Sequence, residues 1–208
     1  MRGHPNASPP GWSDRPRALP REFYSRFTPA VAKDLLNRNL VRRLGGLCLE
    51  GKIVEVEAYR GSDDPASHAY RGRTSRNSVM FGKPGVAYVY FTYGMHYCLN
   101  VVTEKEGVPG AVLIRALEPL RGIEAMKKRR RTSELGTLAN GPARLTQAMA
   151  ITRKLNGIDM TVPGELFVSA ASPNPRPRIV ASTRIGIRLG REKPWRFYTE
   201  GNAYVSVR

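Results

Sequence analysis

The chain has 208 residues, of which 41% are apolar and 25% are charged. This length and composition fit one globular domain, or at most two small ones, and exclude a fibrous or wholly disordered protein. The charge is unbalanced, because 34 lysines and arginines face 17 acidic residues and leave a formal net charge of +17. Such a surplus favours a polyanionic partner, with nucleic acid the first candidate and an anionic membrane surface the second.

The cysteines and histidines offer no framework for a disulfide or a metal. Cys48 and Cys98 are fifty residues apart, and His4, His68 and His96 lack the spacing of metal ligands. No stretch reaches about 18 consecutive apolar residues, and the N-terminus lacks the apolar run of a signal peptide. We therefore expect no metal site and a reducing compartment: the cytoplasm with its nucleoid in a bacterium or the nucleus in a eukaryote, and not secretion.

The first part of the chain divides into a tail and the start of a fold. Residues 1–21 are rich in proline and arginine and lack apolar periodicity, which is typical of a disordered basic tail, so a single domain is expected over residues 22–208. Thr28 and Pro29 form a helix start, and the apolar spacing that follows predicts a helix over residues 28–37.

Two hairpins and a long basic loop follow. Apolar segments at 40–49 and 52–59 predict a hairpin that turns at Glu50 and Gly51, and segments at 86–92 and 96–102 predict a second hairpin with Gly94 in its turn. A loop over residues 60–85 separates them. The remaining predicted elements are a strand at 111–116, helices at 119–131 and 142–151, and short strands at 165–170, 179–187, 195–199 and 203–207. The expected fold class is mixed α+β: one compact domain with a curved, largely antiparallel sheet, a few flanking helices and a protruding hairpin.

One charged pattern within the strands is a candidate for chemistry. The period of two in the strand at 52–59 places Ile53, Glu55, Glu57 and Tyr59 on one face. A half-solvated strand with two ordinary surface acids is the simpler interpretation. In a chain with so few acids, however, a glutamate beside an aromatic residue and a basic loop is also a candidate to act on a bound polyanion. Arg115 interrupts the apolar run VLIRAL and needs a carboxylate, a phosphate or water as its partner, because an unpaired buried charge is costly.

The tyrosines are concentrated in one region of the chain. Six of the nine fall between positions 59 and 97, among basic residues, which is a composition typical of surfaces that stack bases and hold phosphates. Tyr88 and Tyr97 lie within strands, where tyrosines commonly pack, so we expect them in the core. Tyr93 lies at the predicted hairpin tip, where a protruding ring is either a partner contact or a wedge that unstacks DNA.

Five segments together resemble the alkyladenine, or 3-methyladenine, DNA glycosylase family. They are GKIVEVEAYRGSDDPASH (51–68), MFGKPGVAYVYFTYGMHYCLNVV (80–102), VLIRALEPL (112–120), NGPARLTQAMAI (140–151) and KPWRFY (193–198). The resemblance covers about residues 22–207. It implies a monomeric enzyme that binds double-stranded DNA, flips a damaged purine out of the duplex and hydrolyses its N-glycosidic bond, without a cofactor and without a Schiff base.

The resemblance also implies a role for individual residues. Glu57 matches the general base that activates water, and Arg115 matches the arginine that helps to hold that water. Tyr59 and His68 match one wall of the base pocket, Tyr90 matches the other, and Asn100 matches the residue that crowds the amine of an ordinary guanine. The remaining matches and candidates concern DNA: Tyr93 fills the gap left by the flipped nucleotide, Met95 lies beside it, and Arg73, Arg76 and Lys83 are expected at the DNA backbone.

Two other classes of protein remain open at this point. A non-catalytic DNA- or RNA-binding module would keep the charge and the aromatic residues without needing Glu57. A basic membrane-surface protein would need an amphipathic apolar face, which no segment of the sequence shows.

Overall fold

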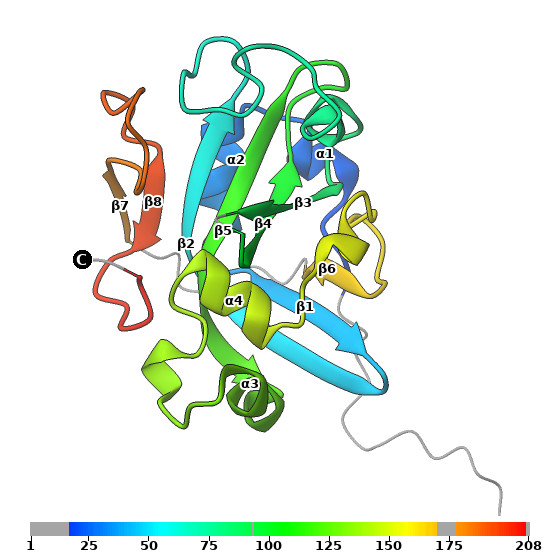
Figure 1. Cartoon of the computed structure of the whole chain (residues 1–208), viewed down its shortest axis with the longest axis vertical. Coiled ribbons are helices and arrows are strands. Elements are labelled where there is room, and N and C mark those ends of the chain that lie inside the picture. The colour runs from blue at the N-terminus through cyan, green and yellow to red at the C-terminus, as the bar shows by residue number, and fades with distance from the viewer. Residues whose placement is uncertain (1–16, 93, 170–177, 207–208) are drawn as a thin grey trace, which may run out of the picture.

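Eight strands form a curved antiparallel sheet in the part of the chain that the computed structural model describes, residues 17–92, 94–169 and 178–206 (Figure 1). The strands are β1 (Asn39–Leu44), β2 (Leu47–Arg60), β3 (Ala87–Thr92), β4 (His96–Val102), β5 (Gly110–Arg121), β6 (Leu166–Val168), β7 (Ile179–Ser182) and β8 (Arg196–Thr199). Their order is β3-β4-β5-β2-β1-β6, and β8 pairs with both β2 and β7. The predicted fold class, a single mixed domain around a curved antiparallel sheet, is confirmed.

Short helices flank this sheet. They are α1 (Arg21–Tyr24), α2 (Thr28–Leu35), α3 (Ile123–Arg130) and α4 (Pro142–Ala148), with single 3₁₀ turns η1 (Ser78–Phe81), η2 (Leu135–Thr137) and η3 (Arg153–Leu155). Helix α2 packs on β2 and β5, and α4 packs on β4 and β5; in Figure 1 they lie behind and in front of the sheet, respectively. Glu104 caps α2, because one of its carboxylate oxygens accepts hydrogen bonds from the backbone nitrogen and the hydroxyl of Thr28. Among the described residues, no helix has the length and apolar character needed to cross a membrane.

Strand β2 is the central strand and the longest. Strand β5 pairs along one edge of β2, and β1 and β8 share the opposite edge. Strand β1 pairs with the first half of β2, and β8 pairs with the part that contains Glu55 and Glu57. An irregularity in the pairing with β5 lies between Ile53 and Glu55. This bulge shifts the in-and-out alternation of the side chains by one residue, so Ile53 joins Val56 in the apolar core. Strict alternation predicts Ile53 on the face of Glu55, and that prediction is wrong.

The first hairpin turns at Gly45 and Gly46, so the predicted turn at Glu50 and Gly51 is wrong. Both turn glycines have positive φ, +53° and +80°, which matches the two left-handed positions of a tight hairpin turn. The second hairpin is as predicted, with β3 ending at Thr92 and β4 beginning at His96.

Several other boundaries differ from the prediction. Pro119 and Arg121 extend β5, because β2 is long enough to pair with them at Gly51 and Glu50, and the predicted helix 119–131 therefore begins only at Ile123. The predicted strand at 179–187 ends at Ser182, and residues 203–206 form turns instead of a strand. The helices predicted over residues 28–37 and 142–151 end early, at Leu35 and Ala148.

The boundary of the predicted tail also moves. Ala18 forms a bridge to Ser169 beside the sheet, and Leu19 is buried in the core, so the packed structure begins before residue 22. Residues 1–16 lie outside the described part of the chain.

Candidate active site

Four side chains form a row across the sheet. Tyr88 pairs with Asn100, Asn100 pairs with Leu113, and Leu113 pairs with Glu57, in neighbouring strands β3, β4, β5 and β2. Directly paired residues of antiparallel strands share a face, so these four side chains all point to the same side. Residues two positions along continue that face, while the alternating valines, leucines and isoleucines form the apolar core on the other side.

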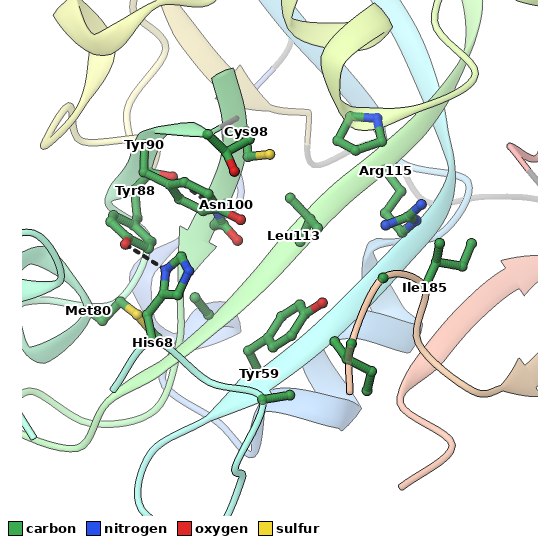
Figure 2. A pocket seen from close by; sticks show the side chains of 16 residues that line it. Tyr59, His68, Met80, Tyr88, Tyr90, Cys98, Asn100, Leu113, Arg115 and Ile185 are labelled. Atoms are coloured by element: carbon green, nitrogen blue, oxygen red, sulfur yellow. Dashed lines mark hydrogen bonds between the residues drawn. The ribbon is translucent and has the colours of Figure 1, made fainter. Parts of the chain in front are cut away.

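This face forms the floor of a cavity of about 250 Å³. Figure 2 shows His68, Tyr88, Tyr90 and Asn100 on one side of the cavity, and Tyr59, Arg115 and Ile185 on the other, with Leu113 between them. The full lining is Tyr59, Ala66, His68, Met80, Tyr88, Tyr90, Thr92, Cys98, Asn100, Ala111, Leu113, Arg115, Pro142, Ile185, Gly186 and Ile187.

The carboxylate of Glu57 lies directly behind this lining. Glu57 has no exposed surface. The simpler interpretation of the sequence, in which Glu57 is an ordinary surface acid on a half-solvated strand, is therefore wrong. One carboxylate oxygen accepts hydrogen bonds from the hydroxyl of Tyr59 at 2.7 Å and from Arg115 Nη1 at 3.2 Å. The other oxygen accepts one from the backbone nitrogen of Ile185 at 2.6 Å. All three donor residues line the cavity, so they form the partition between it and the carboxylate.

Arg115 has the carboxylate partners that its place in an apolar strand required. Its guanidinium joins Glu57 to Glu55, with 3.0 Å from Nε to Glu55. Burial alone would lower the pKa of Arg115, but the two carboxylates raise it above its usual value. Burial likewise opposes ionisation of Glu55, yet Arg115 and two hydrogen bonds from Ser206 hold its pKa below the usual range. Arg115 is therefore a stable cation that holds one edge of Glu57.

Three rings pack together on the opposite side of the cavity. The His68 ring stands edge-on to the Tyr90 ring, with centroids 4.6 Å apart, and His68 Nδ1 lies 3.0 Å from the hydroxyl of Tyr88. His68 therefore shares a side with Tyr90, and not with Tyr59 as the sequence had suggested (Figure 2). Burial, and secondly the charge of Arg76, lower the pKa of His68 below its usual 6.5, which favours the neutral imidazole. Burial raises the pKa of Tyr88 to about 12.

Asn100 is buried at the back of the cavity, with 3% of its surface exposed. Its side-chain nitrogen donates to the carbonyl of Tyr88 at 3.0 Å, which fixes the orientation of the amide. The Asn100 amide is therefore a fixed part of the cavity wall at this point.

The residues expected to contact DNA fall at different distances from the cavity. The exposed guanidinium of Arg76 lies 5.4 Å above the ring of Tyr90, at the rim. Arg73 is exposed over the ring of Phe81, and Lys83 borders a separate depression beside α1. Met95 is 68% exposed at the end of the β3–β4 hairpin, and Tyr93 lies outside the described residues. In the described chain, no three His, Cys, Asp or Glu side chains come together in a way that could hold a metal ion.

Comparison with known proteins identifies the family of the chain. The family model for methylpurine-DNA glycosylase matches residues 22–203. The chain belongs to the methylpurine-DNA glycosylase family. A relative from Carboxydothermus hydrogenoformans is 56% identical over 188 residues, covering 90% of this chain and 98% of that protein. Relatives from Methanocella arvoryzae and Burkholderia lata are 50% and 47% identical, covering 91% and 99% of this chain and 96% of each relative. All three are provisionally named 3-methyladenine DNA glycosylase.

The sequence did not identify every residue around the cavity of this DNA glycosylase. Tyr88 packs as expected, with 1% of its surface exposed, but it also lines the cavity and contacts His68. Its spacing of two from Tyr90 was the available signal, since both must share a strand face. The segment at Ile185 carried no signal, because its contribution is a backbone N–H, which every non-proline residue has.

Proposed function

We propose that this DNA glycosylase flips an alkylated or deaminated purine out of duplex DNA and hydrolyses its N-glycosidic bond with a water molecule activated by Glu57. The products are the free base and an abasic site, which is the first step of base excision repair. The observation that carries the proposal is the position of Glu57: a fully buried carboxylate whose three hydrogen-bond donors all line an aromatic cavity.

The chemistry requires a carboxylate and a water molecule beside the sugar. Cleavage of a glycosidic bond passes through an oxocarbenium-like state, in which the sugar carbon carries positive charge. Glu57 would accept the proton of the attacking water, and Arg115, which donates a hydrogen bond to Glu57, would help to hold that water. One carboxylate is sufficient when the purine is already cationic, because alkylation at N3 or N7 makes the base a good leaving group.

The cavity supplies recognition of the base. Tyr59 and the pair formed by His68 and Tyr90 lie on opposite sides, so a flipped purine would enter between them. The neutral imidazole favoured by the lowered pKa of His68 avoids repulsion of a cationic lesion. Asn100 would crowd a purine that carries a 2-amino group, which is how ordinary guanine would be excluded.

Contacts with the duplex would come from the rim. Tyr93 would occupy the gap left by the flipped nucleotide with Met95 beside it, and Arg73, Arg76 and Lys83 would contact phosphates. Flipping costs a few kcal/mol, least for a damaged or mispaired base, so unpairing itself contributes to selectivity. We propose that the protein acts as a monomer.

The reaction would end at the abasic site, without cleavage of the DNA strand. A glycosylase that also acts as a lyase forms a Schiff base through an amine. Among the described residues that line the cavity, none is a lysine. This supports a hydrolytic enzyme without lyase activity.

A non-catalytic DNA- or RNA-binding module is the alternative. Incubation with methylated duplex DNA, followed by chromatography of the released bases, separates the two. We expect release of methylated purines in step with the appearance of abasic sites. Binding of the same DNA without release of any base would contradict the proposal and support the binding module.

A further inference from the structure

A buried ion pair joins two segments on either side of the cavity. Arg184 and Asp64 are both fully buried, and their two hydrogen bonds measure 2.6 and 2.7 Å. The same guanidinium also donates to the carbonyls of Ala58 and Gly190. Four hydrogen bonds thus connect β2, the loop that follows it and the C-terminal segment at one point.

Asp64 organises the loop on its side of the pair. Its carboxylate also accepts hydrogen bonds from the backbone nitrogens of Arg60 and Ala66. Ala66 and the nearby His68 line the cavity. The shape of this loop, and so the position of one cavity rim, depends on the same carboxylate that holds Arg184.

Arg184 contacts the immediate surroundings of Glu57 without touching Glu57 itself. The next residue, Ile185, donates its backbone N–H to Glu57. The Arg184 guanidinium also lies 4.7 Å from the centroid of the Tyr59 ring, whose hydroxyl donates to the other oxygen of Glu57. Two of the three donors to Glu57 are therefore held in place by Arg184.

The backbone next to the pair leaves space for nothing larger than glycine. Gly190 has a φ of +69°, and a Cβ atom there would lie 2.9 Å from Arg184 Nη2 and 3.2 Å from Asp64 Oδ1. The planar, bidentate fork of an arginine fits this enclosed position, whereas a lysine would offer a single ammonium on a flexible stem.

We propose that Arg184, held by Asp64, is a positioning residue for the general base. It fixes the Ile185 N–H and the Tyr59 ring, and through them it holds the Glu57 carboxylate at the angle needed to take a proton from water. This role rests on the proposed function of Glu57. A displacement of about 1 Å at a reacting group is enough to cost roughly 10²-fold in rate, so a loss of that size is expected when the pair is broken.

The test measures single-turnover excision of a cationic methylated purine from a duplex, together with the affinity for that duplex. Arg184→Gln and Asp64→Asn are each expected to slow excision by about 10²-fold while binding changes by only a few fold. Arg184→Lys keeps the charge without the bidentate geometry and should fall between these variants and the wild type. Leu166→Ala, in β6 at the far edge of the sheet, is the matched control: it destabilises the fold but should not slow excision by the folded protein.

A double-mutant cycle separates positioning from general loss of structure. If Arg184 acts through Glu57, adding Arg184→Gln to Glu57→Gln should cost little further rate, because no base remains to be positioned. An equal loss in both backgrounds would contradict the inference, as would wild-type excision by folded Arg184→Gln or Asp64→Asn. Rapid excision by Glu57→Gln alone would instead overturn the proposed function of Glu57, so the two failures are distinguishable. If Arg184→Gln does not fold, the same cycle with Asp64→Asn or Arg184→Lys decides the question.

Discussion

Replacement of Arg115 by methionine should lower the free energy of unfolding, because two buried carboxylates would lose the cation that they share. The side chain of Arg115 is 8% exposed and bonds Glu55 at 3.0 Å and Glu57 at 3.2 Å, both fully buried. Breaking a buried ion pair from one side typically costs about 3–5 kcal/mol, because the remaining charge loses its partner. Glu55 would retain Arg196 and Ser206 as partners, and Glu57 would retain two donors, so we expect the lower end, about 3 kcal/mol.

The loss should also depend on pH. Arg115 is the main group that lowers the pKa of Glu55 in the folded protein. A lowered pKa adds stability above the unfolded value, about 4.3, and this stability is lost as the pH falls through the folded value. The difference between wild type and Arg115→Met should therefore be largest near pH 7 and should shrink as the pH falls below about 4.

Urea unfolding at pH 7.5 and at pH 3, below the unfolded pKa of a glutamate, provides the measurement. A loss of about 3 kcal/mol corresponds to a decrease in Tm of about 6–12 °C for a chain of this size. Arg42→Met is the matched control, because Arg42 is similarly buried but its acidic partner, Glu165, is 63% exposed. Its loss strands no buried carboxylate and should be the same at both pH values. A loss below about 1 kcal/mol for Arg115→Met, or one that does not change with pH, would refute this account of the network.

Three further predictions concern the cavity and the charged surface. Asn100→Ser should enlarge the back of the cavity and admit purines with a 2-amino group; analysis of released bases should find new guanine, and lost activity without guanine release would contradict the steric role. The imidazole of His68 should titrate below pH 6.5 in an NMR titration, and titration at or above 6.5 would contradict this. Because the unfolded chain binds this proton more readily than the folded protein, the free energy of unfolding should decrease as the pH falls below about 6.5, and His68→Gln should lack this part of the pH dependence. Affinity for duplex DNA should fall steeply with salt, with a log–log slope of about −0.9 for each phosphate neutralised, and a slope near zero would contradict a role for the +17 charge in DNA binding.

Local sequence patterns predicted the elements that lie close together in the chain. The hairpin around Gly94 followed from two apolar runs and one glycine, and β3 and β4 end where those runs end. The need of Arg115 for a partner followed from its place in an apolar run, and its partners are Glu55 and Glu57 on the neighbouring strand. Alternation along that strand also placed Glu57 and Tyr59 on one face, and the two side chains form a hydrogen bond.

Features that depend on distant segments or on backbone groups could not be predicted in this way. The ion pair of Arg184 and Asp64 joins residues 120 positions apart, and no periodicity connects them. The bulge between Ile53 and Glu55 is set by pairing with β5, so it shifts the strand's phase without a local signal. The placement of His68 beside Tyr90 depends on how its long loop folds back over the sheet, which the loop's own residues do not determine.

The role of Glu57 as general base is the central claim, and Glu57→Gln tests it most directly. Glutamine keeps the shape of the side chain but cannot accept a proton from water. Single-turnover excision of a methylated purine and a gel-shift titration on the same duplex should be measured for both proteins. We expect excision to fall by about 10²- to 10⁴-fold while affinity for the lesion duplex stays within a few fold. Excision by Glu57→Gln at a rate close to that of the wild type would contradict the mechanism.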